Sequence, residues 1–311
     1  MAGAPMKVSM VMSTLGRVGE VLLFIRALEQ MEHDDFELIV VDQNPDERLQ
    51  EACRSLDTGF ALHFIRSPLA KGVSRGRNLG VAHASGDVIC FPDDDCVYPP
   101  SLITDVLERF DRTGSDIVCG RAAAPDGRSI NGRFEQHAQR VDRGNVFTTQ
   151  IEWVVFFKRH VFETLDGFDE DIGVGASTPW QACEGPDVTL RALGAGFSVF
   201  YDPALYAHHP ELDTRNPDGA MRAKGRRYAR GMGHVIRKHG YGPLFLANYL
   251  VRPIGGACLS LLKGNPRRCA YYLQVAVGRA EGYAGICLDG ARSRKEQARL
   301  GAREWSEHLH D

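Results

Sequence analysis

The sequence predicts an α/β fold in which a parallel sheet carries helices on both faces. Short apolar runs typical of strands alternate with helical patterns through residues 8–91, and the connections between them are short. Polar residues follow three of these runs at their carboxyl ends. Ligands of such sheets bind beyond the carboxyl ends of the strands, so the same observations predict where a binding site lies.

The expected elements follow one another from the N-terminus. We predict strands at 8–13, 36–42, 60–65 and 88–91, and helices at 21–31, 45–56 and 73–83. A helix at 100–110, strands at 116–120, 151–157 and 197–201, and a helix at 186–193 complete the pattern. Residues 121–149 are polar and irregular, which is typical of a long loop over a binding face.

The composition is that of a soluble globular protein, with 43% hydrophobic and 25% charged residues among 311. A formal net charge of −3 gives no general reason to expect a nucleic-acid partner. The eight cysteines are scattered without a C-x-x-C pair, which favours reduced thiols in a cytoplasmic protein. Residues 1–5 lead directly into a strand-like run, so we expect no signal peptide.

Three consecutive carboxylates, Asp93, Asp94 and Asp95, follow the buried strand predicted at 88–91. Adjacent carboxylates repel one another unless a cation lies among them, and Mg²⁺ and Mn²⁺ prefer oxygen ligands. A solvated acidic loop before the helix at 100–110 is the alternative explanation. The polar ends of two other strands, Ser13-Thr14 and Asp42-Gln43-Asn44, favour a metal and phosphate site at this edge of the sheet.

Several segments also match, in order, the motifs of a known enzyme family. They are Ser13-Thr14, Val40-Val41-Asp42, residues 71–80, residues 91–95, residues 157–170, residues 184–191, and Tyr201-Asp202-Pro203 with His208. Residues 71–80 are similar to the family's G-x-S-x-A-R-N-x-G motif, and residues 91–95 to its Asp-x-Asp segment. The chain therefore resembles the inverting glycosyltransferases of family 2 over about residues 6–210.

The resemblance implies a GT-A fold, which is a Rossmann-like, mostly parallel mixed sheet flanked by helices. It implies transfer of a sugar from a UDP- or GDP-linked donor to a hydroxyl of a carbohydrate or lipid-linked acceptor. The diphosphate leaving group calls for a divalent cation, Mg²⁺ or Mn²⁺. The setting that the resemblance suggests is surface polysaccharide or glycolipid synthesis.

The resemblance also implies roles for individual residues. Asp95, with Asp93 or Asp94, would hold the metal, and the remaining carboxylate would reach the ribose; His208 would complete the metal site. The donor-binding residues would be Thr14, Asp42, Lys71, Arg77, Asp93 and Asp94. Three ordinary explanations remain open: Asp42 as a helix N-cap, Arg77 as a solvated cation, and His208 as a loop histidine.

An inverting transfer needs a general base, and the candidates are Glu184 and Asp187. The family's pattern at 184–191 is E-D-x-D-L-x-x-R, but Gly185 replaces its second acid, which is the usual base. Asp187 could instead only stabilise a helix N-terminus. Asp169 and Trp180 are expected to border the acceptor.

The composition changes after the last motif, and we predict a glycosyltransferase domain at 1–215 and a helical region at 216–311. A run of seven basic residues without an acid lies at 222–238, and two broken apolar runs follow at 244–262 and 270–288. The basic run could reach over the pyrophosphate or lie on an anionic membrane surface. We expect interfacial helices at the inner face of the plasma membrane rather than a soluble subdomain or a span, and a solvated helical tail from Ala291.

Two other functions are consistent with parts of the sequence. A non-catalytic protein that binds a sugar nucleotide would explain Gly185. A sugar nucleotidyltransferase would need a glycine-rich basic loop after the first strand, but residues 13–17 contain a single glycine and a single arginine.

Overall fold

The computed structural model describes residues 6–290, which form two compact units. Within these residues, the first unit comprises 6–169 and Glu184–Leu212, and the second comprises Glu170–Cys183 and 213–290. The longer segment of the second unit begins at Asp213, near the predicted boundary at 215/216, whereas segment 170–183 of this unit falls in the predicted first domain. The expectations for residues 1–5 and for the tail from Ala291 lie outside the described residues.

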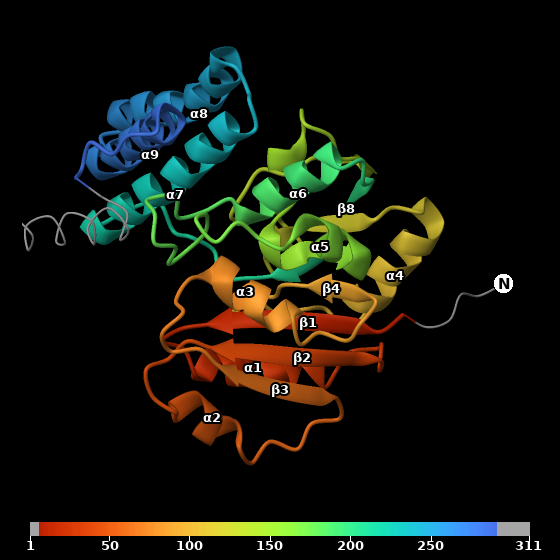
Figure 1. Ribbon diagram of the computed structural model, residues 1–311. Helices are drawn as coiled ribbons and strands as arrows, with labels where there is room; N and C mark the ends of the chain where they lie inside the picture. The colour runs from red at the N-terminus through yellow and green to blue at the C-terminus, as the bar shows by residue number, and fades with distance from the viewer. Residues whose placement is uncertain (1–5, 291–311) are drawn as a thin grey trace, which may run out of the picture. The chain divides into compact units, whose positions relative to one another are not determined.

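The first unit is built on an eight-stranded mixed sheet with the order β3-β2-β1-β4-β7-β5-β8-β6 (Figure 1). The strands are β1 Val8–Thr14, β2 Phe36–Asp42, β3 Ala61–Arg66, β4 Val88–Cys90, β5 Ile117–Ala123, β6 Gln139–Arg140, β7 Val155–Lys158 and β8 Val199–His208. Strands β1 to β4 are parallel to one another, as predicted. Strand β7 runs antiparallel between β4 and β5, and β6 runs antiparallel to β8, so an all-parallel sheet is wrong and a mostly parallel mixed sheet is correct.

Helices cover both faces of this sheet, with α1 and α3 on opposite sides of β1 and β2 (Figure 1). The helices of the first unit are α1 Gly19–Leu28, α2 Arg48–Cys53, α3 Val73–Val81, α4 Leu102–Thr113, α5 Arg159–Leu165 and α6 Glu184–Gly194. Two 3-10 turns, η1 Val146–Thr148 and η2 Glu152–Val154, complete it. The right-handed β-α-β crossovers place α1 on one face, and the return from β3 to β4 places α3 on the other.

The predicted strand at 151–157 is only partly correct. Residues Glu152–Val154 form η2, and the strand begins at Val155. The apolar run is continuous except for Glu152, and a short apolar run does not distinguish a strand from a buried turn. Strand β8 extends to His208, well beyond the predicted end at 201, past an irregularity in its pairing with β5.

Glu37, near the amino edge of the sheet, is a buried carboxylate held by several donors. The Ser9 hydroxyl donates to it at 2.6 Å, the Ser85 backbone N–H donates at 2.7 Å, and the Lys7 ammonium lies 3.3 Å away. Burial acts to raise the pKa of Glu37, but these hydrogen bonds outweigh it and lower the pKa to about 2.

We expect Glu37 to contribute stability that is lost in acid. Because its pKa is about 2 in the folded protein and 4.5 ordinarily, the unfolded chain binds the proton first as the pH falls through that interval. The contribution is therefore complete above about pH 5 and amounts to roughly 1–3 kcal/mol. Urea unfolding of wild type and Glu37→Gln from about pH 7 to pH 2 measures it. The difference in the free energy of unfolding between wild type and Glu37→Gln should shrink as the pH falls. The prediction is contradicted if the free energy of unfolding depends equally on pH in both proteins, or if the exposed control Asp34→Asn loses as much stability as Glu37→Gln.

The second unit contains three long helices, α7 Gly219–Lys238, α8 Pro243–Leu262 and α9 Pro266–Ala284. Helix α9 packs against both α7 and α8 (Figure 1). Glycines allow α7 and α9 to approach closely, since a Cβ on Gly282 would lie 1.9 Å from the Arg230 carbonyl oxygen. The two apolar runs of the sequence thus form α8 and most of α9.

Part of the predicted basic run is used inside this unit. Arg226 and Arg230 of α7 both donate to Glu281 of α9, whose side chain is 1% exposed. Arg230 also pairs with Asp289 at 2.6 Å. These two arginines are therefore not available to a phosphate or a membrane, which corrects the expectation for them. Lys224, Arg227 and the end of α7 remain exposed.

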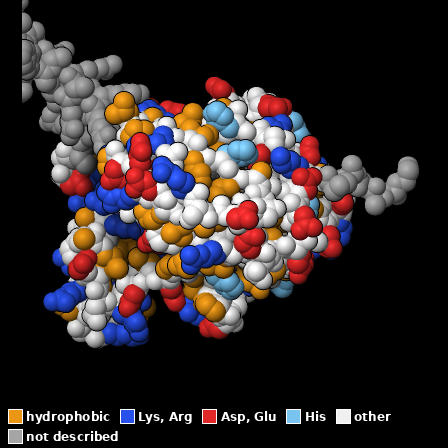
Figure 2. Space-filling view, turned by 90° about the horizontal axis from the view of Figure 1, so that it is seen from below, with side chains coloured by type: hydrophobic (Ala, Val, Ile, Leu, Met, Phe, Trp, Pro, Cys, Tyr) orange, Lys and Arg blue, Asp and Glu red, His pale blue; other side chains and the backbone are white. Residues whose placement is uncertain are grey.

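Charges of both signs are distributed over the surface. On the face in Figure 2, basic, acidic and hydrophobic side chains are interspersed, in keeping with a net charge near zero. Within residues 6–290, α8 is the one helix long and apolar enough to cross a membrane, which by itself is weak evidence for a span.

Candidate active site

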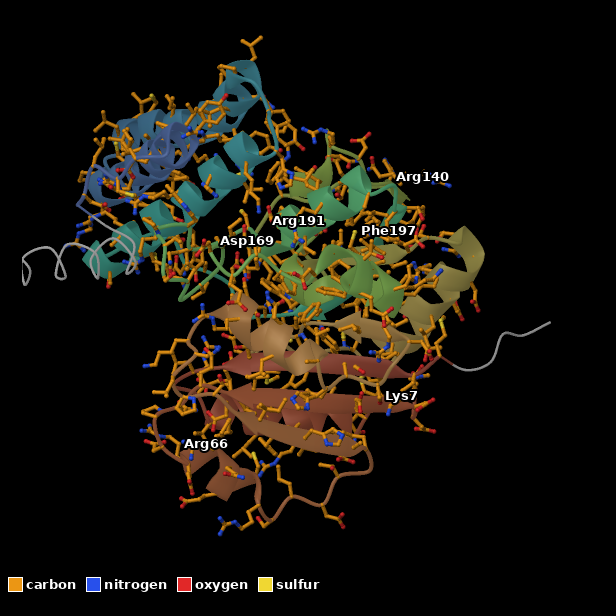
Figure 3. The ribbon with its side chains drawn as sticks, viewed as in Figure 1. Lys7, Arg66, Arg140, Asp169, Arg191 and Phe197 are labelled. Carbon is orange, nitrogen blue, oxygen red and sulfur yellow. The ribbon has the colours of Figure 1, made fainter. Side chains whose placement is uncertain are left out.

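The carboxyl ends of the central strands meet at one edge of the sheet. In the register of β1 and β2, Thr14 lies opposite Asp42, and β4 leads into the acidic triplet on the other side of β1. In Figure 3, Arg66, the last residue of β3, marks this edge of the sheet, and Lys7, just before β1, marks the opposite edge. The three polar strand ends of the sequence therefore converge, as the parallel strands require.

Asp94 is held by residues that follow β1. The Thr14 hydroxyl donates to its carboxylate at 2.6 Å, and Arg17 pairs with it at 2.7 Å. Arg17 also forms an ion pair with Asp95. Burial raises the pKa of Asp94, while Thr14 and Arg17 oppose the rise. Arg17 is not among the predicted site residues, although the repulsion between the carboxylates of the triplet calls for a cation beside them.

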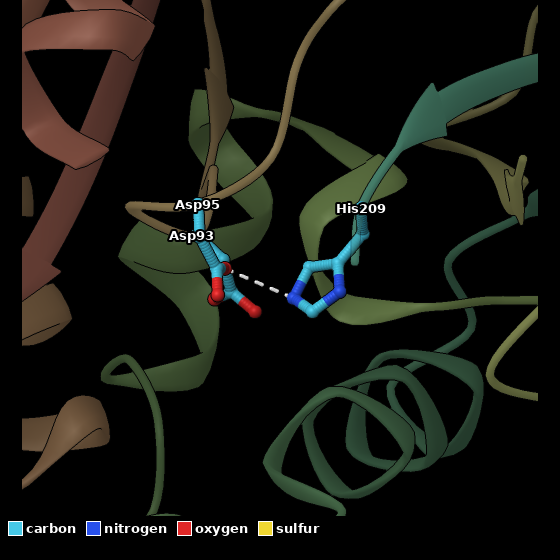
Figure 4. A group of neighbouring side chains, drawn as sticks. All are labelled: Asp93, Asp95 and His209. Atoms are coloured by element: carbon cyan, nitrogen blue, oxygen red, sulfur yellow. Dashed lines mark ion pairs between the residues drawn. The ribbon is translucent and has the colours of Figure 1, made fainter. Parts of the chain in front are cut away.

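Asp93, Asp95 and His209 form a compact group, with one ligand atom from each lying within 4.8 Å of the others (Figure 4). The His209 Nε2 lies 2.9 Å from an oxygen of Asp95. Two carboxylates and an imidazole are a donor set suited to Mn²⁺. The residues therefore fit a divalent cation.

The histidine in this group is His209, whereas the resemblance implies His208. Successive side chains of a strand point to opposite faces, so a shift of one residue reverses the direction. His208 ends β8 and is hydrogen-bonded to the Ala123 carbonyl through its Nδ1 at 3.0 Å. His209 is stacked on Trp153, with ring centroids 4.5 Å apart. The structure brings His209, and not His208, to the carboxylates.

The pKa values of the two carboxylates, Asp93 and Asp95, are shifted in opposite directions. Burial raises the pKa of Asp93 to about 6, with Arg77 and His209 opposing the rise. For Asp95, burial is outweighed by hydrogen bonds from His209 and Arg17, and the pKa falls to about 2. The pKa of His209 is raised because its bond to Asp95 outweighs burial.

Arg77 connects the acidic triplet to α6. It lies on α3 with its side chain 2% exposed, 2.9 Å from Glu184 and 3.1 Å from Asp93. Its guanidinium lies over the rings of Phe91 and Phe168, at 5.8 and 5.6 Å from their centroids. Arg77 is thus a buried counter-ion for two carboxylates and not the solvated cation of the alternative explanation.

Glu184, the first candidate base, is 6% exposed and is bound by this arginine. Glu184 is thus a buried ion-pair partner of Arg77, and its role as general base stays a prediction.

Asp187, the second candidate, is turned to a different partner. Its carboxylate, 1% exposed, accepts a hydrogen bond at 3.1 Å from Arg191 of α6. Arg191, labelled in Figure 3, also donates to the carbonyls of Leu165 and Gly167. Asp166, which replaces the first glycine of the family's G-G-F-D-E, has a φ of 57° in this turn. Asp is among the few residues that adopt such a backbone, so the departure is tolerated.

Glu152 enters the site without having been predicted. An ideal Cβ on Gly185 would lie 2.7 Å from the Glu152 Cγ and 3.3 Å from its Cδ, so the Glu152 side chain fills the space beside Gly185. Burial raises the pKa of Glu152, and the Glu184 carboxylate raises it further. The signal in the sequence was a single acid within the apolar run 151–157.

The donor-binding candidates Asp42 and Lys71 differ in their surroundings. Asp42 is 1% exposed, and one of its oxygens accepts from the Asn44 backbone N–H at 2.9 Å. Within the described part of the chain, its other oxygen has no hydrogen-bond partner. The N-cap of α2 is Glu47, so the capping explanation for Asp42 is wrong. Lys71 is exposed in the loop before α3.

The two acceptor candidates belong to different units. Asp169 closes the first part of the first unit, at the end of the turn after α5 (Figure 3). Trp180 belongs to the second unit, where its ring is stacked on His234 with centroids 4.4 Å apart. Their roles remain predictions.

Solved structures with a similar fold are glycosyltransferases. A mannosyltransferase from Pyrobaculum calidifontis, solved with GDP-Man and Mn²⁺, matches 98% of this chain and 81% of its own at 16% identity, with a TM-score of 0.59. TarS from S. aureus, residues 1–349 with UDP-GlcNAc, matches 91% of this chain and 93% of its own at 16% identity, with a TM-score of 0.52. The first unit therefore has the GT-A fold, as the resemblance implied.

The sequence comparison identifies the family. The profile of glycosyl transferase family 2 matches residues 9–173, just over half of the chain, and the chain belongs to this family. A dolichol-phosphate mannosyltransferase of Pyrococcus furiosus is 29% identical over 147 residues, 47% of this chain and 41% of that protein. The glycosyltransferase AglE of Haloferax volcanii is 24% identical over 208 residues, 64% of either chain. The matches thus span less than two thirds of each of these relatives.

Proposed function

We propose that the protein is a metal-dependent, inverting glycosyltransferase that moves a sugar from a UDP- or GDP-linked donor to an acceptor. The observation that carries this proposal is the group of Asp93, Asp95 and His209 at the carboxyl edge of a family 2 sheet. Surface polysaccharide or glycolipid synthesis is the proposed setting.

The charges around this group support a cation there. Within residues 6–290, the ion-pair partners of Asp93, Asp94, Asp95 and Glu184 are Arg17, Arg77 and His209. When bound, a Mg²⁺ or Mn²⁺ ion would supply positive charge to the diphosphate that leaves from the sugar. A protein that uses this site for a dianionic leaving group needs such a charge, since the local carboxylates would otherwise repel it.

The remaining residues would place the donor. Thr14 orients Asp94 at the end of β1, and Asp42 presents a buried carboxylate oxygen at the end of β2, which suits a hydroxyl or base N–H of a nucleoside. Gln43 holds the loop before α3 through its side-chain hydrogen bonds to Gly72 and Ala70. Lys71 on that loop is a candidate phosphate contact. The nucleotide and the metal in the solved relatives, GDP-Man with Mn²⁺ and UDP-GlcNAc, guide the choice of donors.

A donor screen tests this function. The full chain is incubated with GDP-mannose, UDP-N-acetylglucosamine and other UDP- and GDP-sugars in the presence of Mn²⁺ or Mg²⁺, and release of nucleoside diphosphate is followed with and without acceptor sugars. Metal-dependent release from at least one donor is expected. Donor binding without release would instead support a non-catalytic sugar-nucleotide-binding protein, which would be consistent with Gly185 at the usual base position. Failure of every donor to bind would exclude both the glycosyltransferase and this non-catalytic alternative.

The second unit is proposed to lie on an anionic membrane surface at the inner face of the plasma membrane, beside a lipid-linked acceptor. Helix α8 buries one stripe, Leu246, Pro253, Ala257 and Ser260, but its other sides are also apolar. Leu244, Leu261 and Leu262 are 87%, 64% and 84% exposed. Exposed basic residues such as Arg252 and Lys263 lie on or next to the same helix, a combination typical of interfacial helices.

The double variant Leu261→Glu/Leu262→Glu should bind anionic vesicles at least about tenfold more weakly, because each leucine contributes 1.5–3 kcal/mol when buried in lipid. Co-sedimentation with phosphatidylglycerol and phosphatidylcholine vesicles measures this. Leu23→Glu changes a leucine of α1 that is 64% exposed and serves as the control. If wild type fails to bind either vesicle, or if both variants bind equally well, the membrane proposal is wrong.

A further inference from the structure

We propose that Glu152 is the general base that removes the proton of the acceptor hydroxyl, in the place that Gly185 leaves without an acid. This inference rests on the proposed function and names a catalytic residue that the motifs do not contain.

The geometry beside α6 is the main support. At residue 185 the family's pattern has an acid, whose side chain would begin at a Cβ. In this chain that Cβ position lies 2.7 Å from the Glu152 Cγ and 3.3 Å from a carboxylate oxygen of Glu152. A side chain at residue 185 would have to displace the Glu152 side chain from this space. The space beside Gly185 is therefore filled by the Glu152 side chain, so that a carboxylate is supplied there from η2 instead of from α6.

The neighbours of Glu152 fix it next to the proposed metal group. Its successor Trp153 is stacked on His209, and the Tyr98 hydroxyl donates to the Trp153 carbonyl oxygen at 2.6 Å. Trp153 is 7% exposed, so the turn that carries Glu152 is anchored on both sides. Glu152 itself is half-buried.

The charges that face Glu152 come from three elements. Glu184 of α6 and Asp93 after β4 are negative, and Arg77 of α3 is positive. Arg77 is already paired with both of those carboxylates, whereas within the described residues Glu152 forms no ion pair with an arginine. Burial first, and then Glu184, raise the pKa of Glu152 to about 8. A carboxyl with a pKa near the working pH accepts a proton more readily than an ordinary one.

The proposed step is balanced within the donor and the acceptor. The acceptor oxygen forms a bond to the anomeric carbon while its proton passes to the Glu152 carboxylate. The bond from the anomeric carbon to the phosphate oxygen breaks, and the nucleoside diphosphate leaves with the electron pair. Glu152 then returns the proton to solvent.

Glu152→Gln tests the assignment, with the donor that wild type turns over in the screen and water as the acceptor. We expect donor turnover to fall by roughly 10²- to 10⁴-fold while the dissociation constant for the donor stays within about threefold. Wild-type turnover should rise with pH as Glu152 ionises, and this rise should be absent from the residual turnover of the variant. Glu163→Gln, an exposed carboxyl of α5, is the matched control and should behave as wild type.

A relocation experiment gives a readout that a structural role would not produce. Gly185→Asp alone should lose turnover, because its side chain collides with Glu152. In Glu152→Ala/Gly185→Asp the space beside residue 185 is free for the new carboxylate. The turnover of this double variant should be at least about tenfold higher than that of Glu152→Ala.

Wild-type turnover with an unaffected Glu152→Gln variant, or an unchanged pH profile in that variant, overturns this inference but leaves the proposed function intact. Absence of turnover in wild type with every donor is a failure of the proposed function itself, so the two outcomes are distinguishable.

Discussion

Arg77→Met is expected to lower the free energy of unfolding by about 3–5 kcal/mol and to abolish donor turnover. The substitution keeps much of the volume but removes the charge shared by Glu184 and Asp93, of which Glu184 is almost fully buried. Loss of one partner of a buried ion pair leaves the other charge without compensation, which is more costly than the pair is worth. Urea unfolding at about pH 7, followed by circular dichroism, measures the change.

Two further variants show whether the charge is the cause. In Arg77→Met/Glu184→Gln one uncompensated carboxylate is removed, so at least about 1 kcal/mol of the loss should be recovered. Arg26→Met, at the exposed end of α1, should cost less than about 0.5 kcal/mol. Equal stability of Arg77→Met and Arg26→Met would contradict the account of Arg77 as an essential counter-ion.

Asp95→Asn is expected to weaken Mn²⁺ binding and to reduce donor turnover by roughly 10²- to 10³-fold. Asn has nearly the same shape but no charge, and it replaces one carboxylate of the group that includes Asp93 and His209. A cation contributes several kcal/mol to a developing negative charge, and tenfold in rate corresponds to about 1.4 kcal/mol. Titration calorimetry with Mn²⁺ alone and the donor assay measure the two effects.

The metal itself can be removed in the same experiment. EDTA should stop turnover by wild type, and Mn²⁺ or Mg²⁺ should restore it, while Asp95→Asn should respond little to either ion. Asp111→Asn, an exposed carboxyl of α4, is the matched control. Turnover that persists in EDTA, or Mn²⁺ binding that is the same in Asp95→Asn and wild type, would contradict a metal held by this group.

The contacts of Glu281 explain why charged residues interrupt the second apolar run. Arg279 and Glu281 interrupt the second apolar run, and charged residues within such a run argue against a membrane span. In the structure Glu281 is the buried partner of Arg226 and Arg230. An ion pair between residues 51 or 55 apart leaves no local pattern in the sequence, so only the packing of α9 on α7 shows it.

Much of the first unit could be predicted because its signals are local. Strand β2 is a continuous apolar run and is buried at all seven positions, and the polar residues after β1, β2 and β4 mark one edge of the sheet. The positions of Thr14, Asp42 and the acidic triplet at that edge follow from parallel pairing alone. The antiparallel insertion of β7 could not be predicted in this way, because strand direction depends on pairing partners distant in sequence.

The sequence by itself determined the α/β fold, the family and the edge of the sheet at which the polar strand ends converge. Tertiary structure alone decided which side chains meet there. It placed His209 instead of His208 beside the carboxylates, buried Glu184 against Arg77, and put Glu152 into the space beside Gly185. The physical reason is that periodicity and motif order are properties of neighbouring residues, whereas side-chain direction and charge pairing depend on contacts across the fold.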